Sequence, residues 1–452
     1  MQTATPSQPG AGSALTMSTI AFTACFAVWT VFSIIGVKIK QDLGLSEAQF
    51  GLLVGTPILT GSLVRVFLGV WTEQYGGRLV NLLVMLSAAA ATFLLSYAQT
   101  YPQFLLAALG VGLAGGSFAV GVAYVSKFFP KERQGAALGI FGAGNVGAAV
   151  TKFAAPFVML ALGWQSVAQI WAGVLALLAV AFFLTTKDEP DLLTRRRTGA
   201  KPQATAAQLA PLRKLQVWRF ALYYFFVFGG FVALALWLPH YLVAVYHLDI
   251  VAAGMLAAAY SIPGSLFRVF GGWLADKIGA RKVMYLTFGI SVICAFLLSY
   301  PATSYVVDGV RGPIAFRLAT GLVPFVILLF ALGFAMSLGK AAVYKHIPVY
   351  YPDHVGSVGG LVGMVGGLGG FIMPIAFGAL NDLTGVWTSC FMLLFVLVAG
   401  ALTWMHLAIG RMERASAPQL ANLPELPEMA GMSKTVSFAA PAGRVANPPA
   451  HS

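Results

Sequence analysis

The feature that most constrains this chain is a series of long apolar stretches. A helix needs about 20 mostly apolar residues to cross a bilayer, and the sequence supplies such stretches repeatedly. Only 10% of its 452 residues are charged, against roughly 25% in soluble globular proteins. We predict an all-α integral membrane protein with twelve transmembrane helices, at residues 17–37, 51–71, 79–98, 103–128, 135–162, 167–186, 218–244, 251–275, 283–300, 319–344, 357–380 and 386–409.

A hydrophilic stretch divides these spans into two groups of six. Residues 187–217 contain acidic residues, three consecutive arginines and several Pro and Gln residues, which is typical of a linker. The predicted halves are therefore residues 17–186 and 218–409. The segments 1–16 and 410–452 are predicted to be disordered, because the tail is rich in Pro, Ala and Ser and lacks apolar periodicity.

Lys and Arg are distributed unequally between the loops on the two sides of the predicted membrane. Eighteen lie on the side of the linker and the termini, and only four lie on the other side. Positive loops normally stay in the cytoplasm, so both termini are predicted to be cytoplasmic in a multi-pass protein of the cytoplasmic (inner) membrane. This pattern also explains the net charge of +13 without a nucleic-acid partner.

The two halves repeat each other in sequence. Residues 61–69 (GSLVRVFLG) match residues 264–272 (GSLFRVFGG), which places Arg65 and Arg268 at equivalent positions. The match continues into the next loops, where Glu73 and Arg78 align with Asp276 and Arg281. Two parallel six-helix halves related by an axis along the membrane normal are a transporter architecture.

The loop pattern after the second and eighth spans resembles the signature of the major facilitator superfamily. It reads Gly-x-x-x-Asp/Glu-x-x-Gly-x-Arg in both halves, although the first copy has Glu73 where the family has Asp. The resemblance implies the major facilitator fold. It also implies a gating role for these loops, carried by Glu73, Arg78, Asp276 and Arg281.

All charges predicted to lie mid-span are cationic, namely Arg65, Lys152, Arg268 and Lys340, with Lys345 nearer a span end. Charges at this depth are costly and normally pair with another group or line a cavity. No carboxylate is predicted at the same depth, so the missing counter-charge is most simply an anionic substrate. The alternative is that each arginine donates to helix carbonyls or reaches the membrane interface.

Glycine-rich runs occupy the fifth and eleventh spans, at residues 139–147 and 359–370. With Asn145, with residues 56–65 and with Arg268, they resemble the nitrate/nitrite porter family of the major facilitator superfamily. The resemblance implies an anion bound between Arg65 and Arg268. The other implied binding residues are Asn145, the backbone of Gly144 and Gly367, and the aromatic residues Phe118, Tyr224 and Phe228.

The family includes proton symporters and nitrate/nitrite exchangers, and this sequence resembles the symporters at Lys152. A buried lysine without a counter-charge can exchange its proton during transport, so Lys152, Lys340 and Lys345 are candidates for proton coupling. The predicted function is nitrate/proton symport. Nitrate/nitrite antiport and transport of another small anion remain alternatives.

Two other classes of protein fit the sequence less well. A membrane enzyme would need a carboxylate pair or a His/Cys cluster within the spans, and a channel would not need mobile, repeated halves. The expected partners are nitrate or nitrite, protons and the lipid bilayer, with no cofactor and no metal.

Overall fold

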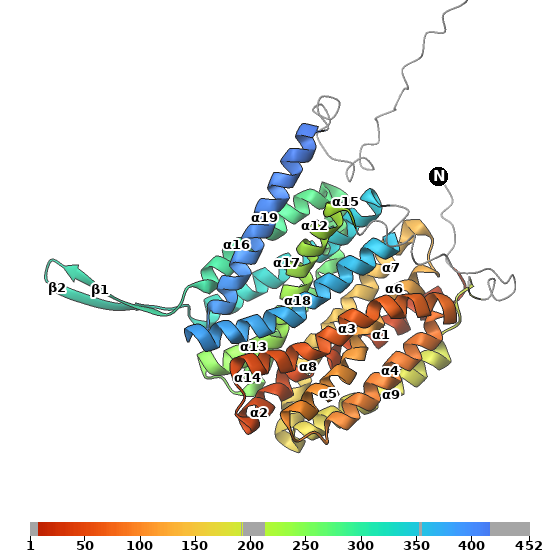
Figure 1. The fold of residues 1–452 in the computed structure, drawn as a ribbon, viewed down its shortest axis with the longest axis horizontal. Helices are drawn as coiled ribbons and strands as arrows, with labels where there is room; N and C mark the ends of the chain where they lie inside the picture. Colours follow the sequence, from red (N-terminus) through yellow and green to blue (C-terminus); the bar gives the residue numbers. More distant parts are fainter. Residues whose placement is uncertain (1–7, 191, 193–212, 352–354, 416–452) are drawn as a thin grey trace, which may run out of the picture.

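The chain is described by a computed structural model that covers residues 8–190, 192, 213–351 and 355–415. Its helices form two groups that lie side by side (Figure 1). The first contains α1 (Ala11–Trp29), α2 (Phe32–Leu43), α3 (Glu47–Tyr75), α4 (Gly77–Leu95), α5 (Tyr101–Val111), η1 (Gly112–Gly116), α6 (Ser117–Ser126), α7 (Lys131–Gly142), η2 (Ala143–Val146), α8 (Gly147–Leu162) and α9 (Trp164–Thr185).

The second group begins after the linker, most of which lies outside the described residues. It contains α12 (Leu215–Tyr224), the π-helical segment η4 (Phe225–Gly230), α13 (Phe231–Tyr246), α14 (Ile250–Leu266), α15 (Arg268–Ile278), α16 (Ala280–Ser299), β1 (Thr303–Gly309), β2 (Gly312–Leu318), α17 (Leu322–Tyr350), α18 (Val355–Thr384) and α19 (Ser389–Ala415).

The helices match the predicted transmembrane fold. In the described part of the chain, ten helices are long and apolar enough to cross a membrane, and the bent pair α14–α15 makes eleven. Each coincides with a predicted span. The remaining predicted span, residues 51–71, lies within α3, which has 29 residues but is not among those eleven.

The sequence repeat has a counterpart in the backbone. Gly76 ends α3 with φ 93° and ψ 141°, and Gly279 ends α15 with φ 91° and ψ 140°. Residues that carry a side chain rarely adopt this positive φ, so glycine is favoured at both places. The two loops that follow the matched motifs therefore turn in the same way, as expected of repeated halves.

The structure corrects three expectations at the edges of the fold. Helix α1 begins at Ala11, so residues 11–16 are helical instead of disordered, and α19 extends past residue 409 to Ala415. The rest of the predicted tail lies outside the described residues. Residues 303–318, which lie between two predicted spans, form an antiparallel hairpin, β1–β2, which interrupts the predicted all-α pattern and projects from the bundle (Figure 1).

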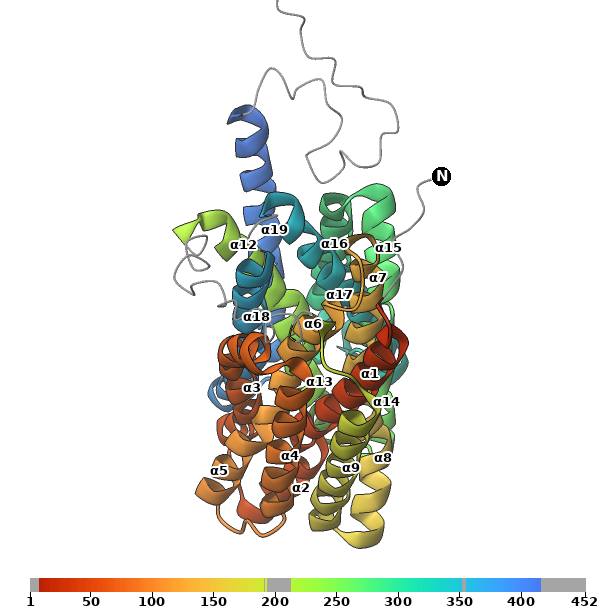
Figure 2. The same cartoon turned by 90° about the vertical axis from the view of Figure 1, so that its right-hand side faces the viewer.

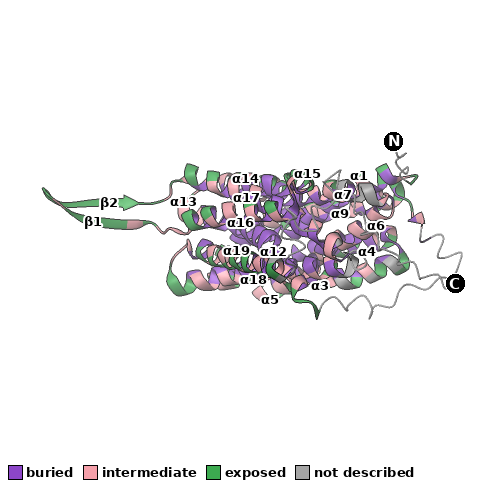
Figure 3. Ribbon diagram, turned by 90° about the horizontal axis from the view of Figure 1, so that it is seen from above, coloured by how far each residue is buried: buried purple, intermediate pink, exposed green. Residues whose placement is uncertain are grey.

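The two ends of the bundle carry different elements: the hairpin projects at one of them (Figure 1), and Figure 2 views the molecule from the side away from the hairpin. At one end, here the linker end, the start of α1 meets the end of α9, where Ser13 Oγ donates to Thr185 O at 2.8 Å. The other end, here the hairpin end, carries β1–β2 and the start of α3. Buried residues gather where the two halves meet, and exposed ones mark the hairpin (Figure 3).

Helices α3 and α18 join the halves through direct backbone contact. A Cβ added to Gly378 would lie 2.1 Å from Glu47 O, and one added to Gly51 would lie 2.2 Å from Pro374 O. Helices α8 and α14 meet similarly, because a Cβ on Gly254 would lie 2.4 Å from Lys152 O. Small residues allow such close helix packing, so the second span contacts the eleventh and the fifth contacts the eighth.

A polar cluster of Lys40, Glu47, His240 and Asp382, here the hairpin-end cluster, also joins the halves. Glu47 binds Lys40 at 3.1 Å within its own half and His240 Nε2 at 2.7 Å in the other half. Asp382 accepts hydrogen bonds from the backbone N–H groups of Glu47 and Ala48 at 3.1 and 2.9 Å. A carboxylate is favourable at this position because the start of a helix has unpaired N–H groups. These contacts tie the two halves together at the hairpin end.

Replacing Asp382 with alanine should favour conformations that are open at the hairpin end. Each hydrogen bond to a charged group contributes about 1.5–3 kcal/mol, so the population should shift by roughly tenfold or more. Spin labels on the exposed Tyr97 and Leu383 would report the separation of the halves. Asp42→Ala is the matched control, because the one ion pair of Asp42 among the described residues is with Lys38 inside α2. An unchanged label distance in Asp382→Ala would show that helix packing alone holds this end closed.

Candidate functional site

Arg65 lies on α3 with its side chain reaching into the other half. Arg65 is 6% exposed, and its guanidinium donates to Gly115 O at 3.3 Å and to Gly363 O on α18 at 3.1 Å. The alternative considered above, in which an arginine donates to helix carbonyls, therefore holds for Arg65. These two bonds hold Arg65 in place, but its positive charge has no counter-charge in the described part of the chain.

Arg268 begins α15 and reaches in the opposite direction. A Cβ on Gly142, in α7 of the first half, would lie 3.3 Å from the Arg268 guanidinium carbon. Arg268 is 7% exposed, and among the described residues its Nη1 has no hydrogen-bond partner. Within that same part of the chain neither arginine forms an ion pair with Asp or Glu. Two buried cations from matching positions thus cross the interface between the halves.

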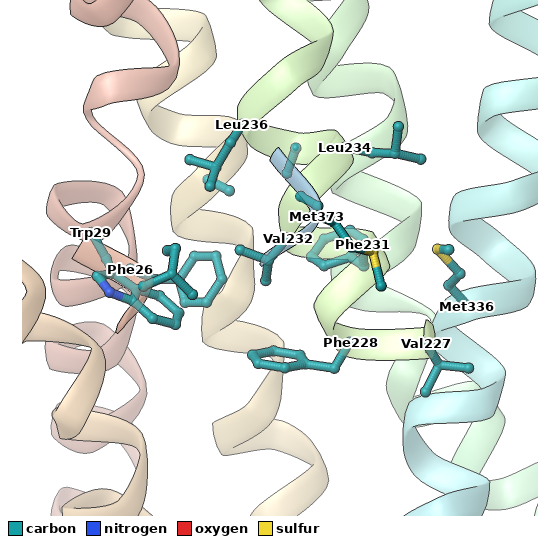
Figure 4. Packing of buried hydrophobic residues seen from close by; sticks show 14 of the residues in the cluster. Phe26, Trp29, Val227, Phe228, Phe231, Val232, Leu234, Leu236, Met336 and Met373 are labelled. Atoms are coloured by element: carbon teal, nitrogen blue, oxygen red, sulfur yellow. The ribbon is translucent and has the colours of Figure 1, made fainter. Parts of the chain in front are cut away.

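Aromatic rings surround both guanidinium groups. The Phe118 ring centroid lies 5.4 Å from Arg65 Cζ and 5.8 Å from Arg268 Cζ, so one ring contacts both cations. Trp29 and Phe228 complete the surroundings of Arg65, at 5.4 and 5.6 Å. In Figure 4, Phe228 points from the second half towards Trp29 of the first. Cation–π contacts of this kind stabilise a buried guanidinium but supply no negative charge.

Of the remaining predicted binding residues, Tyr224 and Gly367 lie close to this pair. Tyr224 stacks on Phe228 with ring centroids 5.1 Å apart, and the position of a Cβ on Gly367 is 3.5 Å from Arg65 Nη1. Asn145 is fully buried, and both polar atoms of its amide are without partners among the described residues. Gly144 packs on Phe22 of α1, and its role in binding stays a prediction.

Three segments next to the site depart from α-helical geometry. Gly115 belongs to the 3₁₀ segment η1, Asn145 to the 3₁₀ segment η2, and Phe228 to the π-helical segment η4. Such interruptions in long helices are frequent at hinges and functional sites. They also change the hydrogen-bonding pattern of the backbone near the two arginines.

The three candidate lysines have different surroundings. Lys152 is fully buried, and its Nζ donates to Ala148 O at 3.2 Å within α8. Lys340 is also fully buried, donating to Gly264 O at 2.6 Å above the Phe231 ring. Lys345 forms an ion pair with Asp276 and is partly exposed. It therefore lacks the buried, unpaired setting on which its candidacy for proton coupling depended.

Two of the predicted gating residues, Arg78 and Asp276, bind within their own halves here. Arg78 donates to Phe183 O at 2.9 and 2.7 Å and lies 3.7 Å from Asp188, while Asp276 pairs with Lys345 of α17. Arg281 lies at the start of α16. Glu73 belongs to α3, but its side chain is outside the described ones. These bonds anchor the loops locally. Among the described residues, neither Arg78 nor Asp276 forms an ion pair with the opposite half.

Sequence reasoning missed Trp29 and Tyr344. Tyr344 lies 5.7 Å from Arg268 Cζ and makes an edge contact with Tyr224. Tyr344 comes four residues after Lys340, so both lie on one face of α17. This spacing is a sequence signal that could have placed Tyr344 near the site. Trp29, whose Nε1 donates to Pro57 O at 2.8 Å, had no such signal.

Comparison with known proteins identifies the family of this chain. The family model of the Major Facilitator Superfamily matches residues 17–322. A protein named probable nitrate/nitrite antiporter NarK1, from Thermus thermophilus, is 41% identical over 427 residues, which cover 91% of this chain and 95% of the relative. A nitrite extrusion protein of Bacillus subtilis is 31% identical, with 87% and 94% covered.

The chain belongs to the nitrate/nitrite porter family of the major facilitator superfamily. A solved structure of a bacterial homolog of the human lysosomal transporter Spinster supports the fold of this porter. It has a TM-score of 0.67 and 17% identity, covering 89% of this chain and 98% of that one. This porter is a multi-pass membrane transporter and not an enzyme.

Proposed function

We propose that this porter carries nitrate, and also nitrite, across the cytoplasmic membrane by alternating access to one central site. The observation that carries the proposal is the pair of buried arginines, which reach across the interface from equivalent positions and pair with no carboxylate among the described residues. Relatives named for nitrate and nitrite transport support the choice of anion. The function rests on Arg65 and Arg268, with Asn145, Phe118, Tyr224, Phe228 and Gly367 around them.

The chemistry of the pair fits a small planar oxyanion. Arginine is always protonated and presents a flat fork of N–H donors, which suits planar anions. An anion beside Arg268 Nη1 and Asn145 Nδ2 would provide acceptors for two donors that have no partner among the described residues. Charge-assisted bonds of this kind are about twice as strong as neutral ones. The flanking rings would restrict the space to a small ion.

Alternating access would proceed by rocking of the halves about this site. The interfaces between α3 and α18 and between α8 and α14 would open in turn, and their glycines permit the close sliding contact this needs. We place the linker end and both termini in the cytoplasm, following the excess of Lys and Arg in the loops on that side. The hairpin-end cluster would then be the external gate.

Nitrate/proton symport is the proposed form of coupling. Lys152 supports it, because a fully buried lysine at the contact of α8 with α14 lies where the halves move. Its proton could be taken up or released as water gains or loses access to that interface. Nitrate/nitrite antiport is the second candidate, favoured by the name of the relative that is 41% identical.

Transport by purified protein in liposomes tests the proposal. Nitrate accumulation driven by an acidic exterior, with no nitrite inside, is the expected result for symport. Flux that requires nitrite on the opposite side and ignores the pH gradient would establish antiport. Saturable flux of another small anion that excess nitrate leaves unchanged would overturn the choice of substrate. Empty liposomes and liposomes with Arg268→Gln protein provide the background.

A further inference from the structure

The two buried arginines are each preceded, three residues earlier, by a serine. Ser62 and Ser265 occupy equivalent positions in the repeat, and both side chains are fully buried. Ser265 Oγ donates to Ser261 O at 2.7 Å, the usual bond of a helical serine to its own helix. Ser62 Oγ has no hydrogen-bond partner in the described part of the chain. A buried hydroxyl without a partner is costly and needs an explanation.

Ser62 faces the glycine run of α18 at the point where Arg65 also reaches it. The position of a Cβ on Gly367 would be 2.3 Å from Ser62 Oγ and 3.5 Å from Arg65 Nη1. A hydroxyl and a guanidinium from the first half therefore converge on one small region of the second. A larger residue at position 367 would displace the hydroxyl. The repeat thus retains a free donor beside one arginine, while the equivalent hydroxyl beside the other is already bonded.

We propose that Ser62 is a specificity-determining residue of the anion site, whose hydroxyl donates to an anion oxygen on the α18 side and thereby favours nitrate over nitrite. The inference rests on the proposed function. The charges of Arg65 and Arg268 attract both monoanions, so they discriminate weakly between them. Nitrate has three oxygens and nitrite has two. The Ser62 hydroxyl can therefore donate to the third oxygen of nitrate, which nitrite lacks. With nitrite bound, this buried donor would stay unpaired, and a site of this kind disfavours the ligand that lacks the acceptor.

The test compares Ser62→Ala with Ser265→Ala in liposomes, measuring KM for nitrate and for nitrite in each variant. Ser62→Ala should raise KM for nitrate roughly tenfold, the effect of one lost hydrogen bond to a charged group. KM for nitrite should rise by about threefold at most. Ser265→Ala should leave both constants within about twofold, since it removes only a bond within its helix. Ser62→Cys, with a similar volume and a weak donor, should behave like Ser62→Ala.

Two results would overturn the assignment while leaving the transporter proposal intact. One is an unchanged KM for nitrate in Ser62→Ala and Ser62→Cys, and the other is an equal rise for both anions. If the alanine variant fails to fold, the cysteine variant decides the question by the same comparison. Wild-type protein that carries neither anion would instead overturn the proposed function, and the role of Ser62 with it.

Discussion

Replacing Arg268 with glutamine is expected to abolish nitrate flux and, at the same time, to raise the thermal stability of the protein. Arg268 is 7% exposed, pairs with no carboxylate of the described chain and leaves Nη1 unbonded. A buried, uncompensated charge costs several kcal/mol. The rings of Phe118 and Tyr344 offset only part of this, since a desolvated cation–π contact contributes about 2 kcal/mol. Neutral glutamine removes the remaining cost.

The loss of function should be large because the same charge binds the substrate. A hydrogen bond to a charged group contributes about 1.5–3 kcal/mol, so losing even one strong bond lowers affinity by roughly ten- to a hundredfold. Liposome flux and thermal unfolding in detergent measure the two effects separately. We expect flux at the level of empty liposomes together with a melting temperature higher by a few degrees.

Arg65→Gln is the matched comparison for this prediction. Arg65 already donates to two backbone carbonyls, Gly115 O and Gly363 O. Its removal leaves both acceptors unpaired and breaks a link between the halves, so flux should fall without any gain in stability. Equal destabilisation in the two variants would mean that Arg268 is a structural residue. Retained nitrate flux in Arg268→Gln would remove the basis of the proposed site.

The positions of the arginines could be predicted from the sequence because the repeat constrains them. An offset of 203 residues aligns Arg65 with Arg268 and Gly76 with Gly279, and repeated halves place aligned residues symmetrically. Apolar length likewise fixed the spans, since the bilayer thickness sets the helix length. Each of these features follows from a single physical requirement, so it can be predicted from a single sequence.

Contacts between the halves could not be predicted in this way. Glu47 and His240 are 193 residues apart, and their pairing depends on how two symmetric halves dock. The different states of Ser62 and Ser265 break the symmetry that made the arginines predictable. Lys345 and Lys340 looked similar in the sequence, but in the structure Lys345 forms an ion pair with Asp276, whereas Lys340 donates to a backbone carbonyl.

The hairpin contains β-branched residues and an Asp-Gly pair, which are signals of a β-hairpin. The helical pattern of the rest of the chain obscured these signals.

Replacing Lys152 with glutamine is expected to uncouple transport from the proton gradient without removing anion exchange. Lys152 is fully buried, its Nζ has one backbone acceptor, and its own carbonyl contacts Gly254 across the interface of α8 and α14. Glutamine keeps a donor for the Ala148 carbonyl but carries no exchangeable charge. For one proton per anion, a gradient of one pH unit should drive roughly tenfold accumulation in the wild type and about none in the variant.

Lys345→Gln is the control for this experiment, because Lys345 is partly exposed and already paired with Asp276. It should retain accumulation driven by the pH gradient, and exchange of labelled nitrate should persist in both variants. Undiminished accumulation in Lys152→Gln would exclude this lysine as the coupling group and leave Lys340 as the next buried cation to replace. A wild-type protein that exchanges nitrate for nitrite and ignores the gradient would instead identify an antiporter, in which Lys152 acts as a fixed positive charge beside the moving interface.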